Sequence, residues 1–143
     1  MRGNLPYATL VEVPATRRPS YPSPVAVPIL NERRKDRFTA LQSMSLRSSY
    51  QSGHYPSLPI YPGVFFIESV ISATRAYFGR AVSIDRVENV RFVSPGMPGE
   101  SFTVVAQLED PVGRSGVWRV SASCCDEHGR MLAEMALHLA LEA

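Results

Sequence analysis

A proline-rich loop leads directly into an apolar segment over residues 53–79, GHYPSLPIYPGVFFIESVISATRAYFG. The three prolines of the loop stand three residues apart, which excludes a helix or a central strand there. From Val64 to Phe78 the residues predict a helix, because Pro62 suits a first-turn position and Gly79 suits the C-terminal cap. The first two turns are apolar on nearly every face, so we expect this helix to be buried.

Strands are predicted after the helix, at residues 86–93, 101–109, 117–125 and 130–142. The last three alternate between apolar and polar residues, and Asp126 to Gly129 predict a hairpin turn between the final two. We therefore expect an α+β fold in which one long buried helix is wrapped by a curved antiparallel sheet. Such a sheet leaves an edge strand that pairing with a second copy would protect, so a dimer is expected.

The N-terminal part has a different composition, since residues 1–28 hold half of the 12 prolines. It predicts an irregular, partly extended arm with an edge strand near Ala8 to Val13. We expect this arm to belong to the same domain as residues 29–143, because the length fits one domain. The charged stretch from Asn31 to Arg37 predicts a turn or loop, and residues 38–46 predict a strand.

Composition and charge exclude several functional classes. The chain has 143 residues, 45% of them hydrophobic, and a net charge of +2, which is too small for a general nucleic-acid binder. No apolar run is long enough to cross a bilayer, and the first residues lack the apolar region of a secretory signal. These features predict a soluble cytoplasmic protein with no membrane partner.

The cysteines predict neither a disulfide nor a metal site. Cys124 and Cys125 are adjacent, so on a strand they point to opposite faces and do not pair with each other. No Cys/His spacing typical of metal ligands is present in the sequence. Packing is the expected role of both residues.

Two titratable residues and one glycine are candidates for chemistry. Glu68 lies among apolar residues of the helix, where desolvation would favour the protonated form, which can donate a proton; an exposed helix face explains it equally well. His54 lies in the braced loop, where an imidazole suits a general base, although a surface histidine is the simpler explanation. Gly63 opens the helix, and its N–H suits an oxygen that develops negative charge.

A base, an acid and an oxyanion donor within one short segment indicate proton abstraction next to a carbonyl. The obvious reaction of this kind is β-elimination of water. The sequence has no G-x-S-x-G nucleophile elbow and no glycine-rich phosphate loop. The reactions that depend on these two motifs therefore have no support in the sequence.

Residues 54–64, followed by Glu68, resemble the active-site signature of the FabZ-type 3-hydroxyacyl-[acyl-carrier-protein] dehydratases. The family pattern is H-[FY]-P-G-x-P-[IV]-x-P-G-V-x-x-x-E, and the step from His54 to Glu68 equals the step in the family. A second block, which includes Phe92, Pro95 and Pro98-Gly99-Glu100, is similar to the family's F-x-x-P-x-x-P-G-[DE] stretch. The resemblance covers roughly residues 38–142.

The resemblance implies a hotdog fold and a homodimer or higher oligomer with each active site shared between two subunits. It implies that His54 removes the α-proton of a 3-hydroxyacyl thioester, that Glu68 of the other subunit protonates the leaving hydroxyl, and that Gly63 polarises the carbonyl. It places Tyr55, Pro56, Ser57, Pro62 and Val64 at the substrate. The resemblance implies no metal or organic cofactor. It also implies that the acyl chain arrives on the phosphopantetheine arm of an acyl carrier protein.

Departures from the family pattern indicate a divergent member. Ser57 replaces a glycine of the histidine loop, and the link between the helix and the next strand is short. Such a member would serve fatty-acid synthesis or a polyketide or polyene pathway. Arg33, Arg34, Lys35 and Arg37 form the densest basic cluster, which suits an acidic carrier protein or is a solvated loop.

Two alternatives to a self-sufficient dehydratase stay open. One is a hotdog thioesterase, which would use a carboxylate to activate water; the combined spacing of His54 and Glu68 argues against it. The other is a non-catalytic subunit that completes a heterodimer with another hotdog protein.

Overall fold

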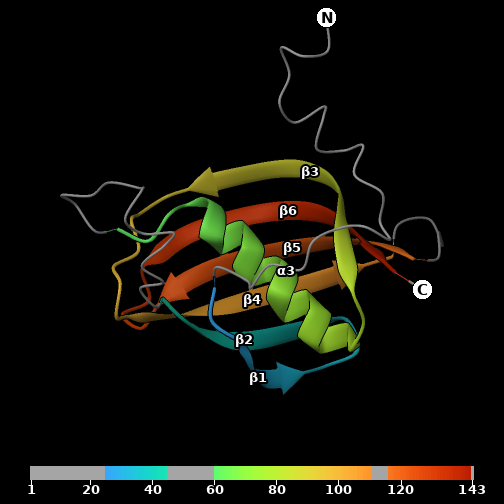
Figure 1. Cartoon of the computed structure of the whole chain (residues 1–143), viewed down its shortest axis with the longest axis horizontal. Helices are drawn as coiled ribbons and strands as arrows, with labels where there is room; N and C mark the ends of the chain where they lie inside the picture. The colour runs from blue at the N-terminus through green and yellow to red at the C-terminus, as the bar shows by residue number, and fades with distance from the viewer. Residues whose placement is uncertain (1–24, 45–59, 111–115, 143) are drawn as a thin grey trace, which may run out of the picture.

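The computed structural model describes residues 25–44, 60–110 and 116–142, which form one helix and six strands. The elements are β1 (Ile29–Arg33), β2 (Arg37–Ser43), α3 (Val64–Phe78), β3 (Val82–Phe92), β4 (Ser101–Glu109), β5 (Val117–Asp126) and β6 (Met131–Leu141). The strands form one sheet in the order β1-β2-β4-β5-β6-β3, and every neighbouring pair is antiparallel. Because α3 crosses one face of this curved sheet (Figure 1), the predicted hotdog arrangement is confirmed.

The helix begins and ends close to where the sequence predicts. Gly79 takes the left-handed conformation at the C-terminal cap with φ of 66°, and its N–H donates to the Arg75 carbonyl at 2.8 Å. At the other end Gly63 is the N-cap, and the N–H of Phe65 donates to the Pro62 carbonyl at 2.9 Å. Pro62 therefore precedes the cap instead of standing in the first turn, which corrects the sequence-based expectation.

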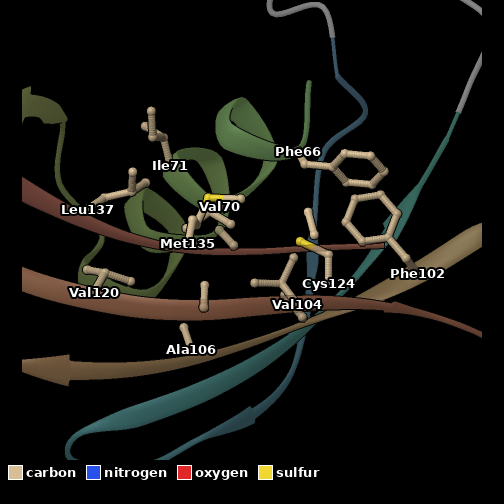
Figure 2. Packing of buried hydrophobic residues seen from close by; sticks show 14 of the residues in the cluster. Phe66, Val70, Ile71, Phe102, Val104, Ala106, Val120, Cys124, Met135 and Leu137 are labelled. Carbon is tan, nitrogen blue, oxygen red and sulfur yellow. The ribbon is translucent and has the colours of Figure 1, made fainter. Parts of the chain in front are cut away.

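The core lies between α3 and the inner face of the central strands. Phe66 and Val70 of the helix face the sheet, and the rings of Phe66 and Phe102 meet edge to face at 5.1 Å. Figure 2 shows the sheet residues that meet the helix: Val104 and Ala106 of β4, Val120 and Cys124 of β5, and Met135 and Leu137 of β6. Burying each large apolar side chain contributes roughly 1.5–3 kcal/mol, so this layer accounts for most of the driving force that holds helix to sheet.

The cysteines lie on opposite faces of β5, as predicted. Cys124 is buried, Cys125 is half-buried, and both are free thiols. Burial raises the pKa of the Cys124 thiol, which keeps the thiol protonated and consistent with a packing role.

Two strand predictions are corrected at the edges of the sheet. The charged stretch from Asn31 to Arg37 was expected to be a turn or loop, but β1 extends to Arg33 and β2 begins at Arg37, so only three residues form the turn. Glu32 and Arg33 lie on the edge strand β1, and Glu32 pairs with Arg34 of the turn at 2.9 Å. A charged composition is compatible with an edge strand because one long side of such a strand faces water.

β3 starts at Val82, four residues before the expected position. Its register with β6 shifts between Ile84 and Arg86 and again between Val87 and Asn89. Each shift inserts a residue and interrupts the alternation of side chains, which removes the sequence signal for a strand. The predictions for β4 and the β5–β6 hairpin, where the alternation is regular, are confirmed.

Several predictions lie outside the described residues. These are the N-terminal arm up to residue 24, the edge strand near Ala8 to Val13, the end of the strand at residues 45–46, and the loop segment 53–59 that contains His54. The division into an arm and a main domain stays a prediction.

A close backbone contact fixes the chain just before the helix. The N–H of Tyr61 donates to the Gly96 carbonyl at 2.7 Å, and the two residues form an isolated antiparallel bridge. A Cβ atom at Gly96 would lie 2.6 Å from Sδ of Met44 and 3.0 Å from Cζ of Phe66. Both of those side chains are buried, so neither can move aside freely.

We expect Gly96→Ala to destabilise the protein by about 1–3 kcal/mol, because the added methyl group overpacks the core at this bridge. Thermal unfolding followed by circular dichroism measures the change. Met97→Ala is the control, since it shortens an exposed neighbouring side chain. Equal melting temperatures for the Gly96 variant and the wild type would show that the bridge tolerates a side chain.

The β5–β6 turn makes stability depend on pH. The Asp126 carboxylate accepts the N–H groups of Arg130 and His128, each at 2.9 Å, and pairs with Nε of Arg130 at 3.0 Å. The Arg130 N–H and these further donors hold the pKa of Asp126 below its usual range. Stabilisation by this carboxylate is therefore present above its unfolded pKa, about 3.9, and is lost as the pH falls through the lower folded value.

We expect Asp126→Asn to melt at a lower temperature than the wild type at pH 7, with a gap that narrows as the pH falls below about 4. The measurement is the melting temperature between pH 7 and acidic pH. Glu127→Gln, at an exposed neighbouring position, is the matched control. A gap that stays constant with pH would contradict the role of the Asp126 charge.

Candidate active site

A cavity of about 550 Å³ lies at the N-terminal end of α3. Residues 60–66 line it from the loop and the first helical turn, and residues 92–95 line it from the end of β3. Most of these side chains are apolar, so the cavity suits an apolar ligand with a polar group near the helix end.

Tyr61 fixes one wall of this cavity. The side chain is buried, and its ring meets Phe65 and Phe66 edge to face at 5.3 Å and 5.2 Å. Its hydroxyl lies 3.5 Å from Oγ of Ser69, which itself donates to the Phe65 carbonyl at 2.7 Å. Burial raises the pKa of Tyr61 to about 12, so the phenol stays neutral and ties the loop to the second helical turn.

Gly63 presents a backbone donor at the cavity. Among residues 25–44, 60–110 and 116–142, no group accepts its N–H, and the helix dipole places partial positive charge at this end. The Phe92 ring packs over the glycine, because a Cβ atom there would come within 3.2 Å of two ring carbons. Because Gly63 has no side chain, the Phe92 ring can pack against it while the Gly63 N–H stays at the cavity. There the N–H can polarise a carbonyl oxygen.

Glu68 lies five residues further along the helix and is not part of the cavity lining. Its side chain is 29% exposed, and Oε2 lies 3.3 Å from Nη1 of Arg75. The carboxylate thus faces outward from the helix instead of lying within the apolar core. A turn of about 100° per residue puts it about 140° around the helix from Gly63.

The structure brings together only part of the predicted site. Pro62, Gly63 and Val64 meet at the cavity, and Val64 is 60% exposed there. Glu68 belongs to the same helix but faces another direction. The remaining predicted residues, His54, Tyr55, Pro56 and Ser57, lie outside the described residues.

The predicted basic cluster lies at the β1–β2 turn, with Arg33 and Arg37 at the adjoining strand ends, beside the C-terminal end of α3. The Tyr77 hydroxyl contacts the carbonyls of Arg34 and Lys35 at 2.5 Å and 2.7 Å, and the Arg33 guanidinium lies 4.9 Å from the centre of the Tyr77 ring. The helix has 15 residues. At about 1.5 Å per residue this turn lies roughly 20 Å from the cavity within one chain.

A network of ion pairs centred on Arg119 lies on the opposite face of the sheet. Arg119 binds both carboxylate oxygens of Glu88 at 2.9 Å and also contacts Glu109 at 3.0 Å. The Arg119 guanidinium lowers the pKa of Glu88 to about 2, with a further contribution from His138. This network joins β3, β4, β5 and β6 away from the cavity, so we assign it to the structure of the sheet.

Sequence reasoning missed two contacts of the site residues. Phe92 covers Gly63, and Arg75 contacts Glu68. The motif block around Phe92 and Pro95 was visible in the sequence, but nothing in the pattern indicates that it meets the helix N-terminus. The spacing of seven residues from Glu68 to Arg75, which returns to the same helix face, was available as a signal.

Metal and membrane features are not found in the described part of the chain. Within it, no three side chains of His, Cys, Asp or Glu are grouped so that they could hold a metal ion. The same residues contain no helix with the length and apolar character that crossing a membrane requires.

Comparisons with known proteins give a consistent assignment. The family model of the ApeI-like dehydratases, described as ApeI dehydratase, matches residues 31–129. The chain is 25% identical over 130 residues to the 3-hydroxyacyl-[acyl-carrier-protein] dehydratase FabZ of Polynucleobacter asymbioticus, which covers 86% of this chain and 85% of the relative. It is 25% identical over 111 residues to FabZ of Nitrosomonas eutropha, covering 71% and 75%.

Solved structures show the same fold at low sequence identity. The dehydratase heterocomplex ApeI:P from Xenorhabdus doucetiae matches with a TM-score of 0.68 and 14% identity, covering 86% of this chain and 87% of that one. A hypothetical thioesterase with coenzyme A from Streptococcus pneumoniae matches with a TM-score of 0.62 and 8% identity, covering 81% and 86%. These likenesses support the fold, and dehydratases and thioesterases both share it.

Proposed function

This chain belongs to the ApeI-like dehydratase family, and we propose that it removes water from 3-hydroxyacyl thioesters of an acyl carrier protein. The product is a trans-2-enoyl thioester for fatty-acid, polyketide or polyene biosynthesis. The resemblance to FabZ-type dehydratases is confirmed by the family match and by the FabZ relatives.

The Gly63 N–H at the apolar cavity is the observation that carries this proposal. Removal of an α-proton from a thioester places negative charge on the carbonyl oxygen. A donor at a helix N-terminus, without a protein acceptor among the described residues, suits that oxygen. Pro62 and Val64 line the same cavity and are proposed to contact the acyl chain, together with Tyr55, Pro56 and Ser57.

The proposed reaction needs one base and one acid. His54 takes the α-proton, and the electron pair of the C–H bond moves to the carbonyl oxygen near Gly63. As the enolate collapses, the bond from C3 to the hydroxyl oxygen breaks, and Glu68 transfers a proton to that oxygen, which leaves as water. Return of the proton from His54 to Glu68 through solvent restores both groups, so these steps use no cofactor.

The direction of Glu68 supports a site shared between two subunits. A substrate seated at Gly63 lies about 140° around the helix from the Glu68 carboxylate of the same chain. If a second subunit places its own glutamate at the cavity, that carboxylate can reach the substrate. The ApeI:P structure is a dehydratase heterocomplex, so we propose that the partner here is either a second copy or another hotdog subunit.

The edge strand β3 offers the surface for that partner. Within the described residues it pairs only with β6, and Ile84 and Val87 on its helix side are 47% and 46% exposed. Phe92, at the end of the same row, is 53% exposed. An unpaired edge that carries exposed apolar side chains is a surface that a second strand would cover.

The residues of β3 suit pairing with a second copy of this chain. One inserted residue lies on each side of Val87, so if Val87 lies on a twofold axis, Ile84 faces Val90 of the other copy. Placing Arg86 or Glu88 on the axis instead would set like charges directly opposite each other, which is unfavourable. We therefore propose a homodimer with Val87 at its axis.

Carrier-protein binding is proposed at the basic turn formed by Arg33, Arg34, Lys35 and Arg37, all of which are exposed. Exposed charge pairs contribute little individually and weaken with salt, so such docking should be salt-sensitive.

We expect this chain alone to remove one water from a 3-hydroxyacyl carrier protein, as measured by intact-protein mass spectrometry. His54→Ala and Glu68→Gln should each lose most turnover, because each removes one proton-transfer group. Mixing the two variants should restore part of the activity, since a hybrid dimer holds one intact pair.

Other outcomes identify the alternatives. Release of free carrier protein would indicate a thioesterase, the activity named for one structural neighbour. No change with several chain lengths would indicate a missing partner subunit, as in the heterocomplex. Near-normal turnover in either variant would contradict the assigned role.

We expect Val87→Cys to form a disulfide-linked dimer on mild oxidation, because facing residues of paired strands lie within the Cα separation of about 4.4–6.8 Å that a disulfide spans. Non-reducing gel electrophoresis measures the product. The wild type, with Cys124 buried and Cys125 half-buried, controls for the native thiols.

The register is tested by two further variants. Ile84→Cys and Val90→Cys should each fail to link to themselves but should link when mixed. Self-linking of Val90→Cys would indicate a shifted register. A wild-type protein that is monomeric by light scattering would contradict the homodimer.

A further inference from the structure

Glu68 is held by one side chain of the same helix. Arg75 follows seven residues later, which at about 100° per residue returns almost to the same side of α3. Its side chain runs back towards the helix N-terminus, as long helical side chains do, and Nη1 lies 3.3 Å from Oε2 of Glu68.

Arg75 is anchored at its other nitrogen. Nη2 donates to the carbonyl of Val82 at 3.5 Å, and Val82 is the buried first residue of β3. The guanidinium therefore bridges the helix, the glutamate and the edge strand. The planar group fixes the relative direction of its two contacts, which a flexible lysine ammonium does not.

The pair contributes little to folding. The Arg75 and Glu68 side chains are 43% and 29% exposed, and ion pairs this open to water contribute about 0–1 kcal/mol. What the contact does restrict is the direction of the carboxylate, which otherwise samples several rotamers.

The contact also gives the two oxygens of the Glu68 carboxylate different surroundings. Arg75 occupies Oε2, whereas Oε1 meets no polar partner in the described part of the chain. A protonated carboxyl group can accept from the guanidinium through Oε2 while its proton is on Oε1.

We propose that Arg75 is a positioning residue for Glu68: it holds Oε2 and so restricts the carboxyl group to a direction from which Oε1 delivers the proton to the leaving hydroxyl. This inference rests on the proposed function. In the reaction the O–H bond at Oε1 breaks, a new O–H bond forms on the leaving oxygen, and water departs. Arg75 exchanges no proton.

The test compares steady-state kinetics of the full chain with Arg75→Met, Arg75→Lys, Glu68→Gln and the Arg75→Met/Glu68→Gln double variant. The substrate is a 3-hydroxyacyl carrier protein. We expect Arg75→Met to lower kcat roughly 10- to 100-fold, the scale of loss caused by a misplaced group, with KM unchanged within about twofold. Arg75→Lys should recover part of kcat, because it keeps the charge without the planar fork.

The double variant separates positioning from a general loss of structure. If Arg75 acts through Glu68, removing it from the Glu68→Gln protein should cost no more than about twofold. Arg80→Met is the matched control, since Arg80 contacts only the Glu142 carbonyl, at 2.8 Å, among the described residues. Arg80→Met should keep wild-type kcat, and all variants should melt close to the wild type.

Normal kcat in Arg75→Met, or an equal further loss in the double variant, would overturn the inference alone. A rise in KM with unchanged kcat would also overturn it, because it would place Arg75 in substrate binding. If Glu68→Gln itself keeps normal turnover, the proposed role of Glu68 fails and this inference fails with it, so the two failures are distinguishable.

Discussion

Contact between the apolar side of α3 and the inner face of the sheet determines where every other feature lies. Phe66 and Val70 are buried against β4, β5 and β6, so the rotation of the helix about its axis is fixed. Once the rotation is fixed, the directions of the remaining helix positions follow from the helical repeat. Gly63 therefore opens on the cavity beside Phe92, and Glu68 lies on the outward side with Arg75.

The loop before the helix depends on the same packing. Tyr61 enters the core beside Phe66, and its backbone bridges to Gly96, which has room for no side chain. The Pro62–Gly63 step thus begins from a buried anchor. A donor at a helix end polarises a carbonyl effectively only when it does not reorganise during the reaction, and a buried anchor provides that rigidity.

The elements that could be predicted are those whose pattern of residues is set by local structure. The helix was placed by its apolar turns and by Gly79, and β4 by regular alternation, because burial on one face imposes the period directly on the residues. β1 and the start of β3 were missed for a common reason. Edge strands are partly solvated, and the shifts at Ile84 and Val87 break the period. At the site, Gly63 was predictable from the Pro-Gly step, whereas the packing of Phe92 over it depends on a tertiary contact that no local pattern contains.

Helical spacing explains why an incomplete site in one chain is consistent with a complete site in a dimer. Five residues separate Gly63 from Glu68, a rotation of about 140°, so the donor and the carboxylate diverge within one chain. Seven residues separate Glu68 from Arg75, a rotation that returns to within about 20°, so those two side chains meet. The N-terminal end of the helix thus opens on a cavity of its own chain, while Arg75 links the outward side of the helix to the start of β3. A glutamate one residue earlier in the helix would lie within about 40° of Gly63 but about 80° from Arg75, so the observed spacing turns the carboxylate away from its own cavity and fits one that serves a neighbouring subunit.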